Sequence, residues 1–225
     1  MATEEEREVL FDAIQEAVDN VVSMVVGGHY DALTQEPQLT AKIAGAIELT
    51  LDQMDLGDLN VKVAVRDFPP QGPGALEGKV GADVYISVAV IGEDRNDVSK
   101  GMLAQAKWDH TIKDAKLPEQ IGKMMERSES SYVWVFGPHG VTCLPAGKYF
   151  DPNPAEEAGQ SVGSLIANGL RCEEGDRRIG RDLTKPLITS LNEIMQDLGV
   201  NTAVSFTIRE GSRRLRLYRR KRRKR

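Results

Sequence analysis

The chain has 225 residues, with 29 Lys and Arg residues against 34 Asp and Glu residues. This length suffices for one sizeable core with appended elements, and no apolar stretch approaches the roughly 18 residues of a transmembrane helix. The acidic start lacks the layout of a signal peptide, and the two cysteines, Cys143 and Cys172, lack metal-site spacing. We therefore expect a cytoplasmic protein with no membrane partner.

The charges are divided unevenly along the chain. Residues 213–225 hold ten basic residues and no acidic one, which leaves the body with 19 basic and 34 acidic residues, a net charge of −15. A like-charged run this dense favours binding to nucleic acid; the alternatives are a solvated tail and an arm that rests on the body's own carboxylates. The expected nucleic-acid contacts are Arg213, Arg214, Arg216, Arg219, Arg220, Lys221, Arg222, Arg223, Lys224 and Arg225.

Two helices are expected first. Thr3-Glu4-Glu5-Glu6 has the form of a capping box, and apolar residues recur at helical spacing from Val9 to Val25. This amphipathic helix, within the segment 1–33, either packs on its own domain or forms a dimer interface, and we expect a symmetric homodimer. The second helix should begin near residues 34–37, with Pro37 in its first turn.

Strands and helices then alternate. A strand at 61–67 leads into an irregular loop rich in proline and glycine at 68–74. The further elements expected here are strands at 84–91, 100–108, 132–136 and 141–144 and a helix from 117. The pattern predicts an α/β core over residues 34–150, with the strands at 84–91 and 100–108 forming a hairpin.

Three polar side chains interrupt this apolar hairpin. Gln105 and Lys107 stand two residues apart on one strand and therefore share a face of the sheet. A buried lysine costs several kcal/mol unless an acid or a bound anion pairs with it. Asp83 directly precedes the partner strand, so we expect it on the same side as the Gln-x-Lys pair.

Asp83 followed by Gln105-Ala106-Lys107 on the next strand resembles the PD-(D/E)XK nuclease superfamily. Glutamine stands where the second acid usually lies, a variant that resembles the Mrr-like branch. The resemblance covers roughly residues 34–145. It implies a restriction endonuclease-like core, in which helices flank a central mixed sheet.

The resemblance also implies a metal site. Asp83, Gln105 and a helix glutamate would hold Mg²⁺, for which Mn²⁺ can substitute, and Lys107 would stabilise charge or orient the attacking water. Glu36 lies in the first turn of its helix, where the family usually places this glutamate, and Glu48 is the other candidate. Both are alternatively solvated helix carboxylates.

The function implied is that of a Mg²⁺-dependent DNA endonuclease. Small nucleases of this kind occur in restriction and anti-phage systems, so DNA and other defence-system subunits are the expected partners. The alternative is a non-catalytic nucleic-acid-binding or assembly protein that retains the nuclease fold. Gln105 leaves this alternative open, because a neutral ligand lowers the metal affinity of the site.

Residues 151–212 are expected to extend the same domain. Helices are predicted at 155–170 and 183–198, separated by a charged, solvated turn at 173–178. A strand at 202–209 and another at 214–218 should form a C-terminal basic β-hairpin that continues into the basic tail.

Overall fold

The computed structural model describes residues 3–30, 32, 35–54, 60–68, 79–92, 97–150 and 159–209. Its helices are α1 (Glu4–Gly27), α2 (Glu36–Gln53), α3 (Leu117–Arg127), α5 (Val162–Leu170) and α6 (Leu187–Leu198). Its strands are β1 (Asn60–Asp67), β2 (Val84–Ile91), β3 (Val98–Trp108), β4 (Ser131–Gly137), β5 (Gly140–Pro145), β6 (Gln160–Ser161) and β7 (Thr202–Arg209). Short 3₁₀ turns follow β3 and β5 and precede α6, at Asp109–Thr111 (η1), Ala146–Lys148 (η2) and Arg177–Ile179 (η3).

The strands form one seven-stranded mixed sheet in the order β1-β7-β2-β3-β4-β5-β6. β2 and β3 are the antiparallel hairpin expected from the sequence, and β4 runs parallel to β3. The last strand, β7, is inserted between β1 and β2, antiparallel to the first and parallel to the second. The expected α/β architecture, a mixed sheet flanked by helices, is therefore confirmed.

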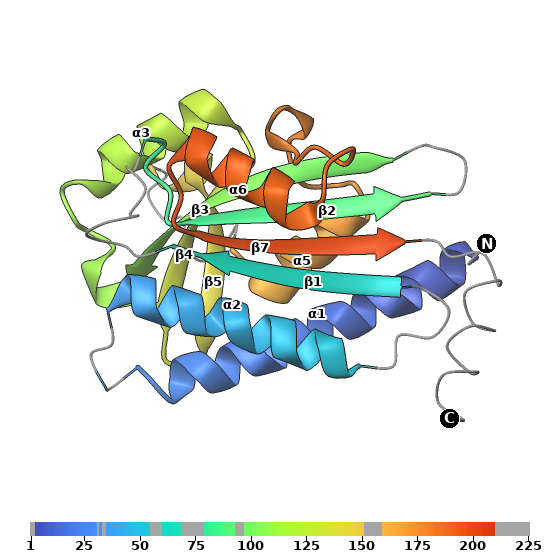
Figure 1. Ribbon diagram of the computed structural model, residues 1–225. Helices are drawn as coiled ribbons and strands as arrows, with labels where there is room; N and C mark the ends of the chain where they lie inside the picture. Colours follow the sequence, from blue (N-terminus) through green and yellow to red (C-terminus); the bar gives the residue numbers. More distant parts are fainter. Residues whose placement is uncertain are drawn as a thin grey trace.

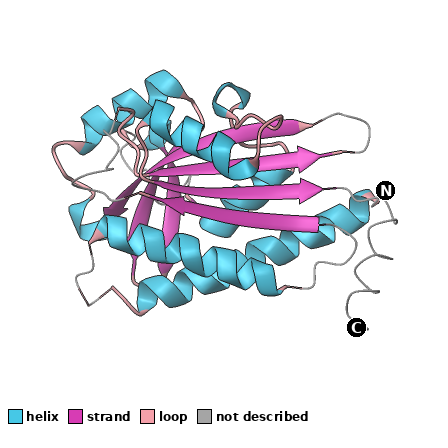
Figure 2. Cartoon of the chain, in the orientation of Figure 1, coloured by secondary structure: helices cyan, strands magenta, loops and turns pink. Residues whose placement is uncertain are grey.

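Helices cover both faces of the sheet (Figures 1 and 2). Side chains of α1, α2 and α5 form a core with alternate strand residues that include Met102, Ala104 and Trp134. The other face packs against α3 and α6, and its core includes Tyr85 and Leu103. Successive residues of β3 therefore serve opposite cores, as the period of two in a strand requires.

The apolar stripe of α1 is buried within the chain itself. Thr3 Oγ1 accepts the N–H of Glu6, whose carboxylate accepts the N–H of Thr3, which confirms the capping box. Ile14 and Val18 are fully buried against the rest of the first core. Helix α5 packs so closely that a Cβ at Gly163 would lie 2.3 Å from Gln15 O. The stripe therefore gives no support to a dimer, and the expected homodimer stays a prediction.

Two predicted helices begin later than expected. The helix predicted at 155–170 begins at Val162, because Ser161 caps it by accepting the N–H of Ser164 at 3.1 Å. Residues 151–158 lie outside the described part of the chain. The helix predicted at 183–198 begins at Leu187, after Pro186, and ends as expected at Gly199, which is left-handed with φ 68°.

The turn at 173–178, expected to be solvated, is held against the start of β3. Gly101 and Asp176 exchange main-chain hydrogen bonds of 2.9 Å in both directions. Lys100 Nζ donates to the carbonyls of Cys172 and Glu174 at 2.6 and 3.1 Å. The side chains of Glu173, Arg177 and Arg178 are exposed as expected, whereas the main chain of the turn is bridged to β3, which a charged sequence does not reveal.

The C-terminal strand expected at 202–209 is β7, and all of it is paired with β1 on one side and with β2 on the other. The strand expected at 214–218, which would complete the C-terminal hairpin, is not among the described residues. Residues 210–225, which include the ten basic residues of the tail, lie outside the described residues, as does most of the loop at 68–74. Among the described helices, none has the length and apolar character that a membrane crossing requires.

Candidate active site

The candidate site lies where β3 extends past its neighbour β2. Val84, the first residue of β2, pairs with Ala104, whereas β3 continues to Trp108. Beyond the end of β2, two side-chain carboxylates accept main-chain N–H groups of β3. Asp83 Oδ2 accepts the N–H of Ala106 at 3.0 Å, and Glu36 Oε1 accepts the N–H of Trp108 at 3.1 Å.

The main chain fixes Asp83 in this position. Its N–H donates to Ala104 O at 2.9 Å and its carbonyl accepts from Thr202 at 3.3 Å. Two residues earlier, Gly81 turns the chain with φ 71°, in the left-handed region that favours glycine. A Cβ at Gly81 would lie 2.6 Å from Gln120 O of α3, so the turn also requires a residue without a side chain.

Gln105 and Lys107 reach the same place from β3. Gln105 Nε2 donates to Asp83 Oδ2 at 2.5 Å. Lys107 Nζ lies 3.6 Å from Glu36 Oε2 and 3.1 Å from Asp114 Oδ2. The structure thus brings together all four residues expected at the site, Asp83, Gln105, Lys107 and Glu36, which we call the edge site.

The other helix glutamate lies elsewhere. Glu48 Oε1 accepts the N–H of Val65 at 3.1 Å, on the edge of β1 that does not face β7. It therefore satisfies a main-chain group at the border of the sheet. Of the two candidates, Glu36 is the one at the edge site.

The acids and the lysine influence one another. Burial raises the pKa of Asp83 to about 6, and the charge of Glu36 adds to the rise, while the Ala106 N–H, Lys107 and Gln105 oppose it. Burial tends to lower the pKa of Lys107, but the hydrogen bond to Asp114 and the charges of Glu36, Asp114 and Asp83 together raise it. Lys107 is therefore a cation at neutral pH.

The oxygen atoms at the edge site fit a hard cation. Gln105 Oε1 is buried and has no hydrogen-bond partner, and Asp83 Oδ1 accepts no hydrogen bond from a described residue. A half-turn of the Gln105 amide would place Oε1 beside the Asp83 carboxylate, an arrangement that a cation between the two oxygens would favour when Asp83 is ionised. Within the described ranges, no three residues of the Asp, Glu, His or Cys types gather closely enough to hold a metal. A metal here would therefore use the neutral amide oxygen as a ligand.

Sequence reasoning missed two residues of the site. Asp114, in the turn between β3 and α3, pairs with Lys107, and Thr111 Oγ1 donates to Glu36 Oε1 at 3.0 Å. Their distance from the Gln-x-Lys motif matches no pattern, so no sequence signal distinguishes them from other surface residues. The path of the chain between β3 and α3 sets their positions.

Comparisons with known proteins return no match. No protein-family model matches the chain, and neither the curated proteins nor the solved structures include a significantly similar one. The assignment of function therefore depends on the residues and their geometry.

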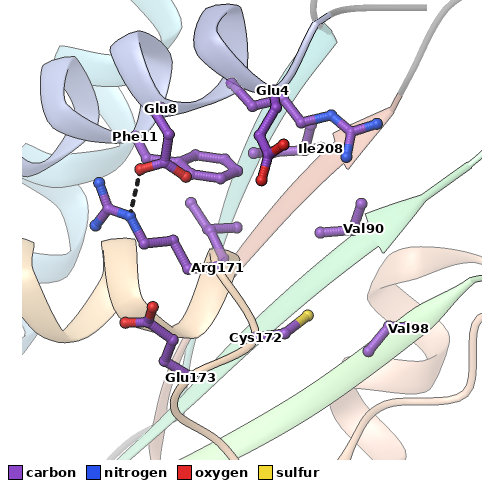
Figure 3. A pocket seen from close by; sticks show the side chains of 11 residues that line it. Glu4, Glu8, Phe11, Val90, Val98, Arg171, Cys172, Glu173 and Ile208 are labelled. Carbon is purple, nitrogen blue, oxygen red and sulfur yellow. Dashed lines mark hydrogen bonds and ion pairs between the residues drawn. The ribbon is translucent and has the colours of Figure 1, made fainter.

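A hollow of about 450 Å³ lies at the other end of β3, between the start of α1 and the end of α5 (Figure 3). Two arginines line it, and one of them, Arg171, is paired with Glu8 and Asp12, each at 2.7 Å. The remaining lining includes the apolar side chains of Phe11 and Val90. This hollow shares no residue with the edge site.

Proposed function

We propose that the protein is a Mg²⁺-dependent DNA endonuclease of the PD-(D/E)XK type. The observation that carries this proposal is the convergence of Asp83, Gln105, Glu36 and Lys107 on one open strand edge, from strand β3, helix α2 and the residue before β2. The order α2, β1, β2, β3, α3, β4 supports the proposal, because it contains the helix, strand, hairpin, helix and strand expected of such a core.

In the proposed reaction, a bound Mg²⁺ would supply Lewis-acid stabilisation of the phosphate and lower the pKa of a water molecule. Asp83, Glu36 and Gln105 Oε1 are the residues that would hold it. Asp83 must lose its proton to do so, and its raised pKa makes this step depend on pH. Lys107, kept charged by Glu36 and Asp114, would stabilise negative charge on the phosphate or orient the nucleophilic water.

A non-catalytic nucleic-acid-binding protein is the second candidate. One observation favours it: Asp83 and Glu36 each already accept a main-chain N–H of β3, as Glu48 does on β1. Carboxylates can therefore be retained at this edge for the stability of the sheet alone. On this reading the protein binds nucleic acid and cleaves none.

Incubation of the purified protein with supercoiled plasmid separates these functions. We expect nicked and linear DNA in Mg²⁺ or Mn²⁺ and none in EDTA. Asp83→Asn and Lys107→Met should abolish cleavage, because they remove a metal ligand and the cation. Glu48→Gln is the matched control, because it changes a carboxylate with the same main-chain role away from the site. If the wild type and all three variants bind DNA and none of them cleaves it, the second candidate is favoured.

For the biological setting, we propose restriction or anti-phage defence, with DNA as substrate and other defence-system subunits as partners. Small nucleases with this motif occur in such systems. Cells expressing the wild-type chain should plate phage less efficiently than cells expressing Asp83→Asn. Equal plating with both would argue against a defensive role for the edge site.

A further inference from the structure

A buried arginine on the α6 side of the sheet has no acidic partner among the residues that the structure describes. Arg181 is 5% exposed, and its Nη2 donates to Thr207 Oγ1 at 2.8 Å. Its Nε is buried without a hydrogen-bond partner. By contrast, Arg171 is paired with two carboxylates. A buried guanidinium is normally paired, because removing its charge from water is unfavourable.

No described carboxylate compensates this charge. Asp182, the next residue, is exposed and accepts hydrogen bonds from Thr184. Burial lowers the pKa of Arg181, Tyr85 opposes this, and the like charge of Arg209 lowers it further. A second cation, Arg209, therefore lies near Arg181.

Further donors surround Thr207 on the same face. Its cross-strand partner on β1 is Lys62, and Arg209 lies two residues further along β7, so alternation puts these side chains on one face. Both cations are exposed. Ser205, two residues before Thr207, has a buried hydroxyl with no hydrogen-bond partner. The described side chains of this region thus include three cations and two hydroxyl groups.

We propose that Arg181, Lys62, Thr207 and Arg209 form a binding site for a phosphate-type oxyanion. The planar guanidinium presents several donors that match the oxygens of a phosphate, and hydroxyl groups supply further ones. The oxyanion is either free phosphate or a phosphate group of a nucleic acid. This site shares no residue with the edge site, so it does not depend on nuclease activity.

Thermal unfolding in EDTA, with increasing inorganic phosphate at constant ionic strength, tests the proposal. At ten times its Kd, phosphate should raise the Tm of the wild-type protein by about 3 to 6 °C. Arg181→Met should remove this response and leave the protein at least as stable in phosphate-free buffer, because an unpaired buried charge is replaced by an apolar group. The Lys62→Gln/Arg209→Gln double variant, which changes only exposed side chains, should weaken the response at least tenfold.

Arg178→Gln is the control, because Arg178 is an exposed arginine already paired with Asp176. It should respond to phosphate as the wild type does. A short DNA oligonucleotide that competes with phosphate would identify the source as nucleic acid, and its failure to compete would identify a free anion. The proposal is overturned by a wild type that does not respond, or by a response that Arg181→Met retains.

Discussion

Asp83 Oδ2 accepts the N–H of Ala106 at 3.0 Å, on the first stretch of β3 that β2 no longer reaches. A carboxylate thus occupies the position of a main-chain carbonyl. The hydrogen bond stabilises the charged form, yet burial dominates and raises the pKa of Asp83 to about 6. The sheet therefore holds a carboxylate that a cation would stabilise.

Asp83 should lower the stability of the metal-free protein as the pH rises. Its pKa is about 6 when folded against 3.8 ordinarily, so between these values the folded state binds more protons than the unfolded state. The free energy of unfolding then falls with rising pH, by roughly 3 kcal/mol in total. Asp83→Asn should remove this dependence, making the variant equal to the wild type at pH 4 and more stable at pH 7.

Urea unfolding from pH 4 to 7 measures this difference, and other titrating groups cancel between the two proteins. Saturating Mg²⁺ should restore the stability of the wild type at pH 7 and leave Asp83→Asn unchanged. If the free energies of unfolding of the two proteins depend on pH in the same way, folding does not raise the pKa of Asp83.

Glu36 and Glu48 should differ in metal binding although they have the same main-chain role. Glu36→Gln and Glu48→Gln each replace a carboxylate that accepts an N–H at 3.1 Å, and the amide oxygen can still accept. We expect similar small losses of stability from both. Only Glu36→Gln should weaken Mn²⁺ binding, by about tenfold or more, because only Glu36 faces Lys107 and Asp83. Calorimetric titration with Mn²⁺ tests this, and equal affinities would remove Glu36 from the metal site.

Gly81→Ala should disrupt the turn that positions Asp83. The new methyl group would occupy a left-handed position and lie 2.6 Å from Gln120 O, so we expect a loss of about 3 kcal/mol or more. Gly122→Ala, in the same helix as Gln120, is the control. A Cβ at Gly122 meets nothing within 4 Å, and the change should stabilise α3 by about 0.5 to 1 kcal/mol. Equal effects in urea unfolding would contradict the close contact of Gly81 with α3.

The basic tail should contribute affinity for DNA without base preference. Each phosphate that it neutralises adds roughly −0.9 to the slope of log K against log salt for duplex DNA, so six contacts would give a slope near −5. Deletion of residues 213–225 should flatten this slope and weaken binding equally for different sequences. Fluorescence anisotropy at several salt concentrations measures the slope. Unchanged affinity and slope after the deletion would mean that the tail makes no such contacts.

Local patterns in the sequence predicted most elements and part of the edge site. The capping box, Pro37 and Gly199 act within a turn of the chain, so they could be recognised without knowing the fold. The spacing of Gln105 and Lys107 placed both on one face of β3, because that face follows from the period of a strand. Asp83 joined them because it directly precedes the adjacent strand of a hairpin.

Relationships between distant segments depend on how the elements pack. The fold selected Glu36 over Glu48, because both are helix glutamates and their distance from β3 depends on how α2 packs. It inserted β7 between β1 and β2, since an apolar alternating strand suits a sheet centre as well as a hairpin. It also buried Arg181 beside Thr207. Local sequence patterns thus predict the elements and the chemistry that they carry, whereas packing sets which charges meet, because burial and distance determine the free energies of those charges.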